Sequence, residues 1–367
     1  MKKIRILHIQ LLPLLSGVQN VMLDILDGLP KDKYEIWVMS RGNGPLIKVL
    51  KERKFHHIEL KKIVRNISLS DISAFLEIYF HIRNYKFDIV HTHSSKPGFL
   101  GRIAAKATGT SLIVHTSHGA PYHEMQPFFI NRFYKILEKI AGLFADKVVF
   151  VNNFIEEEAI DLKLIAPEKA VTIYNGIYLK KNIVKEIKNT EKIIVGTCSR
   201  FEKQKNIKVM TRAIIKACRK NKNLHFIMLG DGKDFDYCLN LVKSAGLEER
   251  IEMPGWQNPD ERYPEFDYFL IYSGWEGLSI SALDALSYGL PVVSSDIPAM
   301  QVLVKENYNG FLVDFHNPDK LTEVLANLKK DEKFLEMGKN SLKLADNFSV
   351  EKMKKEYLKL YEEGTVK

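Results

Sequence analysis

Two acidic residues, Glu276 and Asp284, stand eight positions apart in a stretch whose composition suits ligand binding. The apolar run 269–271 before them predicts a buried parallel strand, and the glycine-rich residues 273–277 predict a turn. Ser279 then offers a hydroxyl that can cap a helix. Because a strand-to-helix loop lies at the carboxyl edge of a parallel sheet, where open α/β folds bind ligands, both acids are candidate site residues.

The position of the two acids suggests what they could bind. The amino terminus of the predicted helix favours an anion such as phosphate, whereas a glutamate beside it can accept hydrogen bonds from sugar hydroxyls. Eight residues on an ideal helix turn through about 800°, which would place Asp284 about 80° from Glu276 and facing the same crevice. Spacing alone also fits the alternative of a surface glutamate and a solvated aspartate.

Cations and histidines follow other predicted strands. Arg200 and Lys205 stand in the loop after the apolar run 193–197. His93 and His118 follow the predicted strands 88–91 and 111–115, so two histidine-bearing loops leave one edge of the same sheet. Histidine can orient a sugar hydroxyl and titrates near neutrality, which makes His118 a candidate for work at a reacting sugar.

Residues 275–279, 284–286 and 289–293 together resemble the signature of the retaining glycosyltransferases of family 4, which have the GT-B architecture. The family pattern is Glu-x7-Glu, a helix of small residues, and Gly-x-Pro-Val-Val. The resemblance implies that Glu276 lies near the donor sugar and that the second acid holds the nucleotide ribose. Here that second acid is Asp284, which keeps the charge but loses roughly 1.5 Å of reach.

The same resemblance implies roles for other donor-side residues. Arg200 and Lys205 match the pair of cations that the family places on the donor diphosphate, where fixed positive charge stabilises the leaving group. Further donor contacts are implied for Gly17, beside the diphosphate, for Trp256, beside the base, and for the loop residues Gly277, Leu278 and Ser279.

Residues 91–110 and 112–119 resemble the acceptor half of family-4 enzymes that build bacterial surface polysaccharides and lipid-linked glycans. This match implies that His118 lies at the catalytic crevice, with Glu276, and that His93 and Lys96 lie on the acceptor side. It also implies an acceptor that is a glycan or a glycan linked to polyprenyl diphosphate.

Strands alternate with helices throughout, which predicts an α/β protein with doubly wound parallel sheets. The predicted domains are residues 1–178, completed by a helix at about 350–367, and residues 192–349. The polar, lysine-rich residues 178–191 predict the linker. With the resemblance, this organisation becomes a GT-B fold of two Rossmann-like domains, with the substrates expected in the crevice that separates them.

The composition is that of an ordinary globular protein, with 367 residues of which 46% are hydrophobic and 27% charged. No apolar run approaches the roughly 20 residues that span a bilayer, and the first 15 residues are interpreted as a strand rather than a signal peptide. The three cysteines form no CxxC pair, which predicts reduced thiols and a cytoplasmic location.

The net charge of +9 would suit nucleic acid, anionic lipid or phosphorylated substrates, but no nucleic-acid-binding motif is present and no such partner is expected. The apolar helix predicted at 128–144 carries Arg132, Lys135 and Lys139. It is either a partly buried helix with a solvated basic stripe or a face that contacts anionic lipid. Because the family often acts on lipid-linked acceptors, peripheral contact with the inner face of the cytoplasmic membrane is a further expectation.

The sequence therefore predicts a retaining glycosyltransferase that moves a sugar from a nucleotide-diphosphate sugar, a UDP-sugar by preference, to a glycan or lipid-linked glycan. We expect no cofactor and no metal, because the histidines near residues 91–118 lack the HExxH pattern and paired acids. The alternatives are a nucleotide-sugar epimerase of the same fold, a sugar phosphorylase, and a non-catalytic subunit that binds glycan or a partner enzyme.

Overall fold

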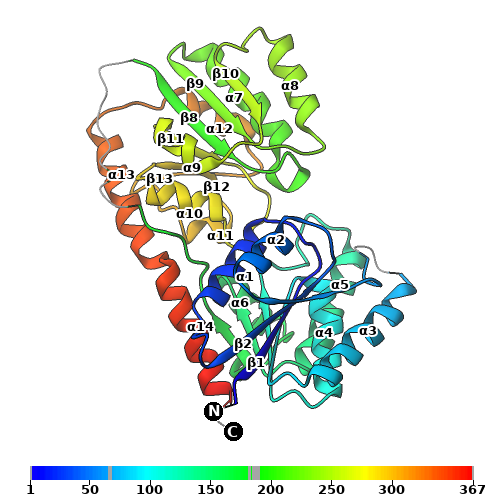
Figure 1. Cartoon of the computed structure of the whole chain (residues 1–367). Helices are drawn as coiled ribbons and strands as arrows, with labels where there is room; N and C mark the ends of the chain where they lie inside the picture. The colour runs from blue at the N-terminus through cyan, green and yellow to red at the C-terminus, as the bar shows by residue number, and fades with distance from the viewer. Residues whose placement is uncertain (1, 65–67, 181–182, 184–190, 366–367) are drawn as a thin grey trace. The chain divides into compact units, whose positions relative to one another are not determined.

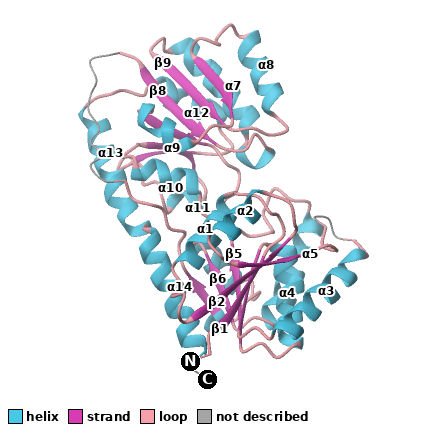
Figure 2. Cartoon of the chain, in the orientation of Figure 1, coloured by secondary structure: helices cyan, strands magenta, loops and turns pink. Residues whose placement is uncertain are grey.

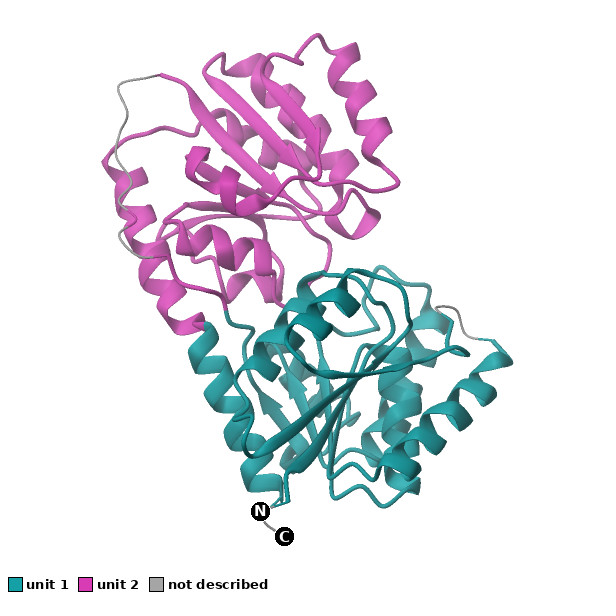
Figure 3. Cartoon of the chain, viewed as in Figure 1, with its two compact units in different colours: residues 1–176, 350–367 teal, residues 177–349 magenta. Residues whose placement is uncertain are grey.

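The computed structural model describes residues 2–64, 68–180, 183 and 191–365, and it divides into two compact units (Figures 1 and 3). Unit 1 comprises Met1–Gly176 and Val350–Lys367, and unit 2 comprises Ile177–Ser349. The predicted linker, residues 178–191, lies largely outside the described residues. Both units alternate strands with helices, as Figure 2 shows, so the predicted α/β class is confirmed.

Unit 1 is built on a seven-stranded, fully parallel sheet with the order β3-β2-β1-β4-β5-β6-β7. Parallel strands place all their carboxyl ends at one edge, where the loops after β1, β4 and β5 therefore meet. The strands are β1 (Ile4–Ile9), β2 (Tyr34–Ser40), β3 (His56–Glu59), β4 (Ile89–His93), β5 (Leu112–Ser117), β6 (Lys147–Phe150) and β7 (Ala170–Thr172).

Helices cover both faces of this sheet. On one face, Ile9 and Val90 pack with Ile78 of α3 and Ala104 of α4 in a core cluster of buried side chains. On the other face, α14 packs against β5 and α1. The helices of unit 1 are α1 (Gly17–Asp27), α2 (Pro45–Glu52), α3 (Ser70–Tyr85), α4 (Ser95–Ala107), α5 (Phe128–Leu143), α6 (Asn153–Asp161) and α14 (Val350–Thr365).

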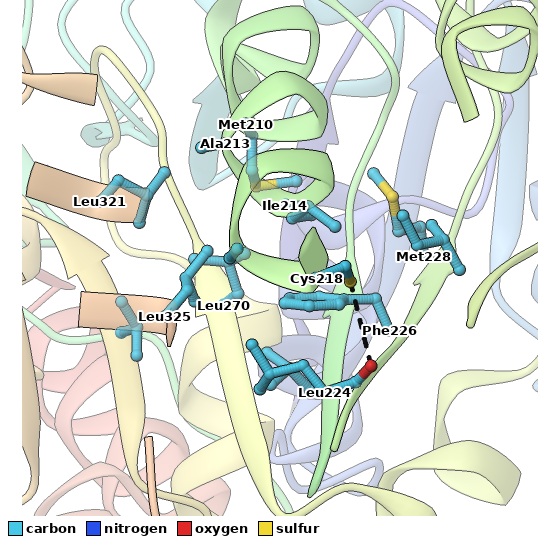
Figure 4. Close-up of a cluster of buried hydrophobic side chains, with 14 of the residues drawn as sticks. Met210, Ala213, Ile214, Cys218, Leu224, Phe226, Met228, Leu270, Leu321 and Leu325 are labelled. Carbon is cyan, nitrogen blue, oxygen red and sulfur yellow. Dashed lines mark hydrogen bonds between the residues drawn. The ribbon is translucent and has the colours of Figure 1, made fainter. Parts of the chain in front are cut away.

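Unit 2 is built on a six-stranded parallel sheet with the order β10-β9-β8-β11-β12-β13. The apolar residues of α7 face this sheet and close a core in which Phe226 and Leu270 meet Cys218, Leu321 and Leu325 (Figure 4). The strands are β8 (Ile193–Cys198), β9 (Leu224–Leu229), β10 (Ile251–Gly255), β11 (Tyr268–Ile271), β12 (Val292–Ser295) and β13 (Gly310–Val313). The helices are α7 (Ile207–Lys220), α8 (Phe235–Ser244), α9 (Pro259–Arg262), α10 (Ile280–Ser287), α11 (Pro298–Gln301), α12 (Pro318–Ala326) and α13 (Glu332–Ala345).

Apolar patterning predicted most strands to within two residues, and the main error in unit 1 lies at Pro45. No helix was expected at residues 45–52, whereas Pro45 is the first residue of α2. Proline suits that position because its fixed φ and missing N–H cost nothing in the first turn of a helix. Among the described residues, no helix is both long enough and apolar enough to cross a membrane.

Candidate functional site

The carboxyl edge of the unit 2 sheet brings Lys205 and Glu276 together. The loop after β8 carries Lys205, the loop after β11 carries Glu276, and these strands are neighbours in the sheet. The Lys205 Nζ lies 2.5 Å from the Glu276 Oε1, and the two side chains are only 14% and 8% exposed. A charged pair with so little exposure is held in one geometry, and it leaves two ammonium donors of Lys205 for a ligand.

Gln204 ties the two loops to each other and to Arg200. Its backbone oxygen accepts from Gly274 N at 2.9 Å, and its Nε2 donates to the Trp275 oxygen at 3.0 Å. Its Oε1 accepts from Arg200 Nη2 at 3.3 Å. The Arg200 guanidinium also pairs with Glu202 at 3.0 Å and is 59% exposed. The edge therefore holds one enclosed cation and one solvent-facing cation beside a carboxylate.

Glu276 does not lie on the helix, and the expected rotation of 800° therefore does not apply. Helix α10 begins at Ile280, four residues after Glu276, and Ser279 caps it by accepting from Ala282 N at 3.4 Å. Gly277, Leu278 and Ser279, predicted as donor contacts, are buried in this loop. The cap uses one lone pair of the Ser279 hydroxyl, and its contact with a donor stays a prediction.

Asp284 lies in an apolar and acidic setting. Burial raises the pKa of Asp284 to about 7, with a further rise from Asp260 and an opposing effect from Lys180. Burial, and secondarily the Asp284 charge, raises the pKa of the Cys198 thiol to about 12. Cys198 ends β8, so Asp284 lies close to the carboxyl edge that carries Lys205.

Trp256 follows β10 at the same edge. Its side chain is 75% exposed, so it contributes little to the core and is available to a ligand. Gly230 N donates to Gly255 O at 2.9 Å, which fixes the end of β10 to the loop after β9. Gly230 and Gly255 both have positive φ angles, of 131° and 81°, which glycine adopts without strain.

In unit 1, His118 and His93 meet behind the carboxyl edge. The His118 Nε2 lies 3.0 Å from the His93 Nδ1, and His93 is completely buried while His118 is partly exposed. The predicted acceptor-side role of His93 stays a prediction, and its buried ring contacts His118 from within the fold. Burial lowers the pKa of His118 to about 4, below the near-neutral range that its residue type predicts.

Lys96 forms an ion pair within unit 1, and Gly17 begins a helix. The Lys96 Nζ pairs with Asp71 of α3 at 2.6 Å, with side chains 12% and 20% exposed. Gly17 is the exposed first residue of α1, and Ser16 before it forms a capping box with Gln19. Both residues lie at the carboxyl edge of the unit 1 sheet, where the sequence predicted them, and their contacts with substrate stay predictions.

Sequence reasoning missed three buried side chains around His118. His8 is the second-last residue of β1, and its Nδ1 lies 2.9 Å from the His93 Nε2. Tyr361 of α14 contacts His91 Nδ1 at 2.6 Å, and Gln10 is fully buried beyond His8. A polar residue near the carboxyl end of a first strand was the available signal for His8 and Gln10. The ring nitrogens of His8, His91 and His93 that could bind a metal ion lie within 4.8 Å of one another. Judged by residue type and spacing alone, these three histidines would fit a metal site.

Solved structures share this arrangement of strands and helices. The crystal structure of Anabaena HepE in complex with UDP and glucose matches with a TM-score of 0.81 at 18% identity, over 98% of this chain and 99% of that one. At that identity the likeness shows the fold, which is GT-B.

Family comparisons make the assignment more specific. A model for Glycosyltransferase Family 4 matches residues 15–181, and a model for glycosyl transferases group 1 matches residues 180–344. The chain belongs to glycosyltransferase family 4, as its sequence resemblance implied.

Curated relatives are similar over nearly the full length. The Escherichia coli UDP-Gal:alpha-D-GlcNAc-diphosphoundecaprenol alpha-1,3-galactosyltransferase is 32% identical over 95% of this chain and 94% of the relative. A Campylobacter jejuni N-acetylgalactosamine-N,N'-diacetylbacillosaminyl-diphospho-undecaprenol 4-alpha-N-acetylgalactosaminyltransferase is 24% identical over 91% of this chain and 88% of the relative. The predicted class of enzyme, a glycosyltransferase, is therefore confirmed.

Proposed function

We propose that this enzyme transfers a hexosyl group from a UDP-sugar to a glycan linked to polyprenyl diphosphate, with retention of the anomeric configuration. The observation that carries this proposal is the 32% identity, over 95% of the chain, to a relative named for UDP-Gal and for a diphosphoundecaprenol acceptor. Retention is proposed from family membership. The donor sugar itself is left to experiment, because single hydroxyls of the sugar decide it.

Unit 2 supplies the chemistry of the leaving group. As the glycosidic bond breaks, negative charge develops on the diphosphate oxygens, and Lys205 and Arg200 are cations fixed at one sheet edge to stabilise it. Two fixed cations supply positive charge of the kind that a divalent metal would supply, so we propose that the transfer requires no metal.

Glu276 is proposed to bind the donor sugar rather than to attack it. Its Oε1 is ion-paired with Lys205 at 2.5 Å, which stabilises the carboxylate and makes it a weaker nucleophile. The other oxygen can accept hydrogen bonds from sugar hydroxyls. We therefore propose a same-face displacement in which the acceptor hydroxyl attacks directly and no covalent glycosyl-enzyme forms.

A donor panel tests the function. The purified enzyme would be incubated with UDP-Gal, UDP-Glc, UDP-GlcNAc, UDP-GalNAc or GDP-Man, with EDTA, and with or without a synthetic GlcNAc-diphosphoundecaprenol acceptor. We expect UDP release from one UDP-sugar only when the acceptor is present, and an equatorial anomeric proton in the NMR spectrum of the product, as an α linkage requires. Inversion at the anomeric carbon, or activity that EDTA abolishes, would contradict the mechanism. Epimerised donor without acceptor would instead identify an epimerase.

Helix α5 supports contact with a membrane surface. Five exposed apolar side chains recur at intervals of three and four residues, and in this helix only Ala141 and Gly142 are buried. The exposed residues Arg132 and Lys139 flank this stripe and would attract anionic lipid headgroups. We define the α5 stripe as Phe129, Phe133, Ile136, Ile140 and Leu143.

Two charges placed in the α5 stripe should weaken membrane binding. The double variant Phe133→Asp, Ile140→Asp removes apolar contact area and repels anionic lipid, so we expect at least a tenfold loss of binding to phosphatidylglycerol vesicles in a flotation assay. Tyr308→Asp replaces an exposed aromatic residue of unit 2 and serves as the matched control, with binding unchanged. Equal vesicle binding by all three proteins would rule out α5 as the contact.

A further inference from the structure

One face of the unit 1 sheet carries a row of polar side chains inside the fold. The parallel register pairs His8 of β1 with His91 of β4, and His93 of β4 with Thr116 of β5, so all four side chains lie on the same face. Each of the four is 0% exposed. Buried polar groups are expected to be hydrogen-bonded, so the partners of this row decide what it does.

Hydrogen bonds join the row into one chain that runs from His118 to helix α14. The chain passes through both tyrosine hydroxyls of α14 that face the sheet, and these tyrosines are themselves buried. In order, the contacts are His118 Nε2 to His93 Nδ1 at 3.0 Å, His93 Nε2 to His8 Nδ1 at 2.9 Å, His8 Nε2 to the Tyr361 hydroxyl at 3.3 Å, that hydroxyl to His91 Nδ1 at 2.6 Å, His91 Nε2 to Thr116 Oγ1 at 2.7 Å, and Thr116 Oγ1 to the Tyr357 hydroxyl at 3.0 Å.

The imidazoles of this chain are neutral at physiological pH. Burial lowers the pKa of His8 to about 3 and that of His118 to about 4. Burial, with smaller contributions from the neighbouring histidines, also holds the pKa values of His91 and His93 well below the usual range. A neutral imidazole has one N–H donor and one lone-pair acceptor, so the direction of any one hydrogen bond sets the direction of the next.

Two proton orders run in one direction along the whole chain, and any other order makes the Tyr361 or Thr116 hydroxyl accept twice and leaves its own proton without an acceptor in the chain. In the first, the Tyr357 hydroxyl donates to Thr116, every following bond points the same way, and His118 Nε2 finally accepts from His93. In the second, Tyr357 accepts from Thr116, and its own proton has no acceptor among its hydrogen-bond partners in the described part of the chain. Burial of an unpaired hydroxyl proton is unfavourable, so the first order is selected.

We propose that His93, His8 and Tyr361 are positioning residues that hold His118 as the tautomer with its proton on Nδ1. His118 then presents an N–H donor to an oxygen atom of the bound substrate and cannot act there as a base. The proposal rests on the proposed function for the role of His118 at the sugar. Tyr361 of α14, which lies 243 residues after His118 in the sequence, would thus help to determine which ring nitrogen of His118 carries the proton.

The geometry favours this chain over a metal site at the same histidines. Ligation would require lone pairs of His8, His91 and His93 to converge on one ion, with second-shell partners on their other nitrogens. Instead, His8 Nδ1 and His93 Nε2 lie 2.9 Å apart in direct contact, which fits a hydrogen bond between the rings. His8 and His91 both have their remaining nitrogens on hydroxyl partners.

Long-range proton–nitrogen NMR on the full chain, labelled with nitrogen-15 at its histidines, reads the tautomers directly at pH 7. We expect the Nδ1–H form at His118, His93 and His8, although free histidine in water prefers Nε2–H. An Nε2–H signal at His118 in the wild-type protein, or one metal ion bound per chain, would overturn the proposal. This readout needs no turnover, so it is independent of whether the proposed function is correct.

Two tyrosine-to-phenylalanine variants on the same helix separate the tautomer effect from packing. Tyr361→Phe cuts the chain between His8 and His91, so we expect the Nε2–H form of His118 to appear and kcat/KM to fall about fivefold to tenfold, the size of one hydrogen bond. Tyr357→Phe removes an equally buried hydroxyl but leaves Thr116 donating to His91, so the Nδ1–H form should persist. Identical tautomer signals from the two variants would show that α14 does not set the proton order.

Discussion

Replacing Lys205 with methionine should lower kcat/KM for the nucleotide-sugar donor by about a thousandfold. One preorganised donor to developing charge contributes about 10²–10³ in rate, and an ammonium group with 14% exposure acts where water screens it little. Methionine keeps most of the length and the apolar stem of lysine and removes only the charge. Initial rates of nucleoside diphosphate release, at donor concentrations below KM, measure the effect.

Lys208 provides the matched control for Lys205. It lies three residues further along the chain and pairs with Asp234 at 2.9 Å, but its side chain is 45% exposed. An exposed pair of this kind contributes at most about 1 kcal/mol, so Lys208→Met should leave the rate unchanged. Equal losses in Lys205→Met and Lys208→Met would point to a general charge effect on the donor rather than a specific contact.

The double variant Lys205→Met, Glu276→Gln separates stability from catalysis. Lys205→Met alone leaves Glu276 as an enclosed charge without its partner, which typically costs about 3 kcal/mol of unfolding free energy. Removing the second charge should restore most of that stability while the rate stays low. Recovery of both stability and rate would mean that Lys205 serves only the fold.

The meeting of Lys205 and Glu276 could be predicted because it depends on few facts. Apolar runs locate β8 and β11, and the carboxyl ends of parallel strands share one edge. The family resemblance then implies that both residues contact the donor. The sequence does not show that the Gln204 amide ties the two loops together, because that contact depends on loop backbone geometry.

The histidine chain could not be predicted because it depends on strand register and helix docking. His8 meets His91 only because β1 and β4 pair in one register, and shifting it by one residue would put these side chains on opposite faces. Tyr357 and Tyr361 carry the helical spacing of ordinary packing residues, and their hydroxyl contacts appear only once α14 is docked. The pKa shifts of His118 and Asp284 could not be predicted either. Both shifts come mainly from burial, and the residues that bury a side chain are distant from it in the sequence.

Replacing Asp284 with asparagine should raise the free energy of unfolding at pH 8 by about 2–4 kcal/mol and change it little near pH 3. Burial raises the pKa of Asp284 to about 7 from 3.8, so between these values the native state holds a proton that the unfolded chain has lost. Stability of the wild type therefore falls as pH rises from about 4 to about 7, at about 1.4 kcal/mol per pH unit, and the loss is complete above pH 7. Asparagine keeps the shape and does not titrate. Urea unfolding at a series of pH values measures the difference.

Asp260 should determine the pH range over which ionisation of Asp284 lowers the free energy of unfolding. Its carboxylate raises the pKa of Asp284, and it also pairs with Lys180, at 3.1 Å, whose charge lowers that pKa. Asp260→Asn removes the repulsion and releases Lys180, so the pH at which the stability loss is complete should move below 7. If the wild type and Asp284→Asn lost stability in parallel over pH 4–8, the titrating group would be another residue.

Donor binding should shift the pKa of Asp284 in the direction opposite to that caused by burial. Ribose hydroxyls donate hydrogen bonds, and a carboxylate accepts them better than a carboxylic acid does, so binding should lower the pKa of Asp284 and release its proton. The Kd of UDP should therefore fall as pH rises towards about 7, by at most tenfold per pH unit, and level off above it, with proton release detectable by calorimetry in buffers of different ionisation enthalpy. Asp284→Asn should bind more weakly at pH 8 and lose the pH dependence. The ionised Asp284 would then destabilise the free enzyme and be stabilised by the bound nucleotide. If UDP bound the asparagine variant as tightly as the wild type at pH 8, Asp284 would have no contact with the ribose.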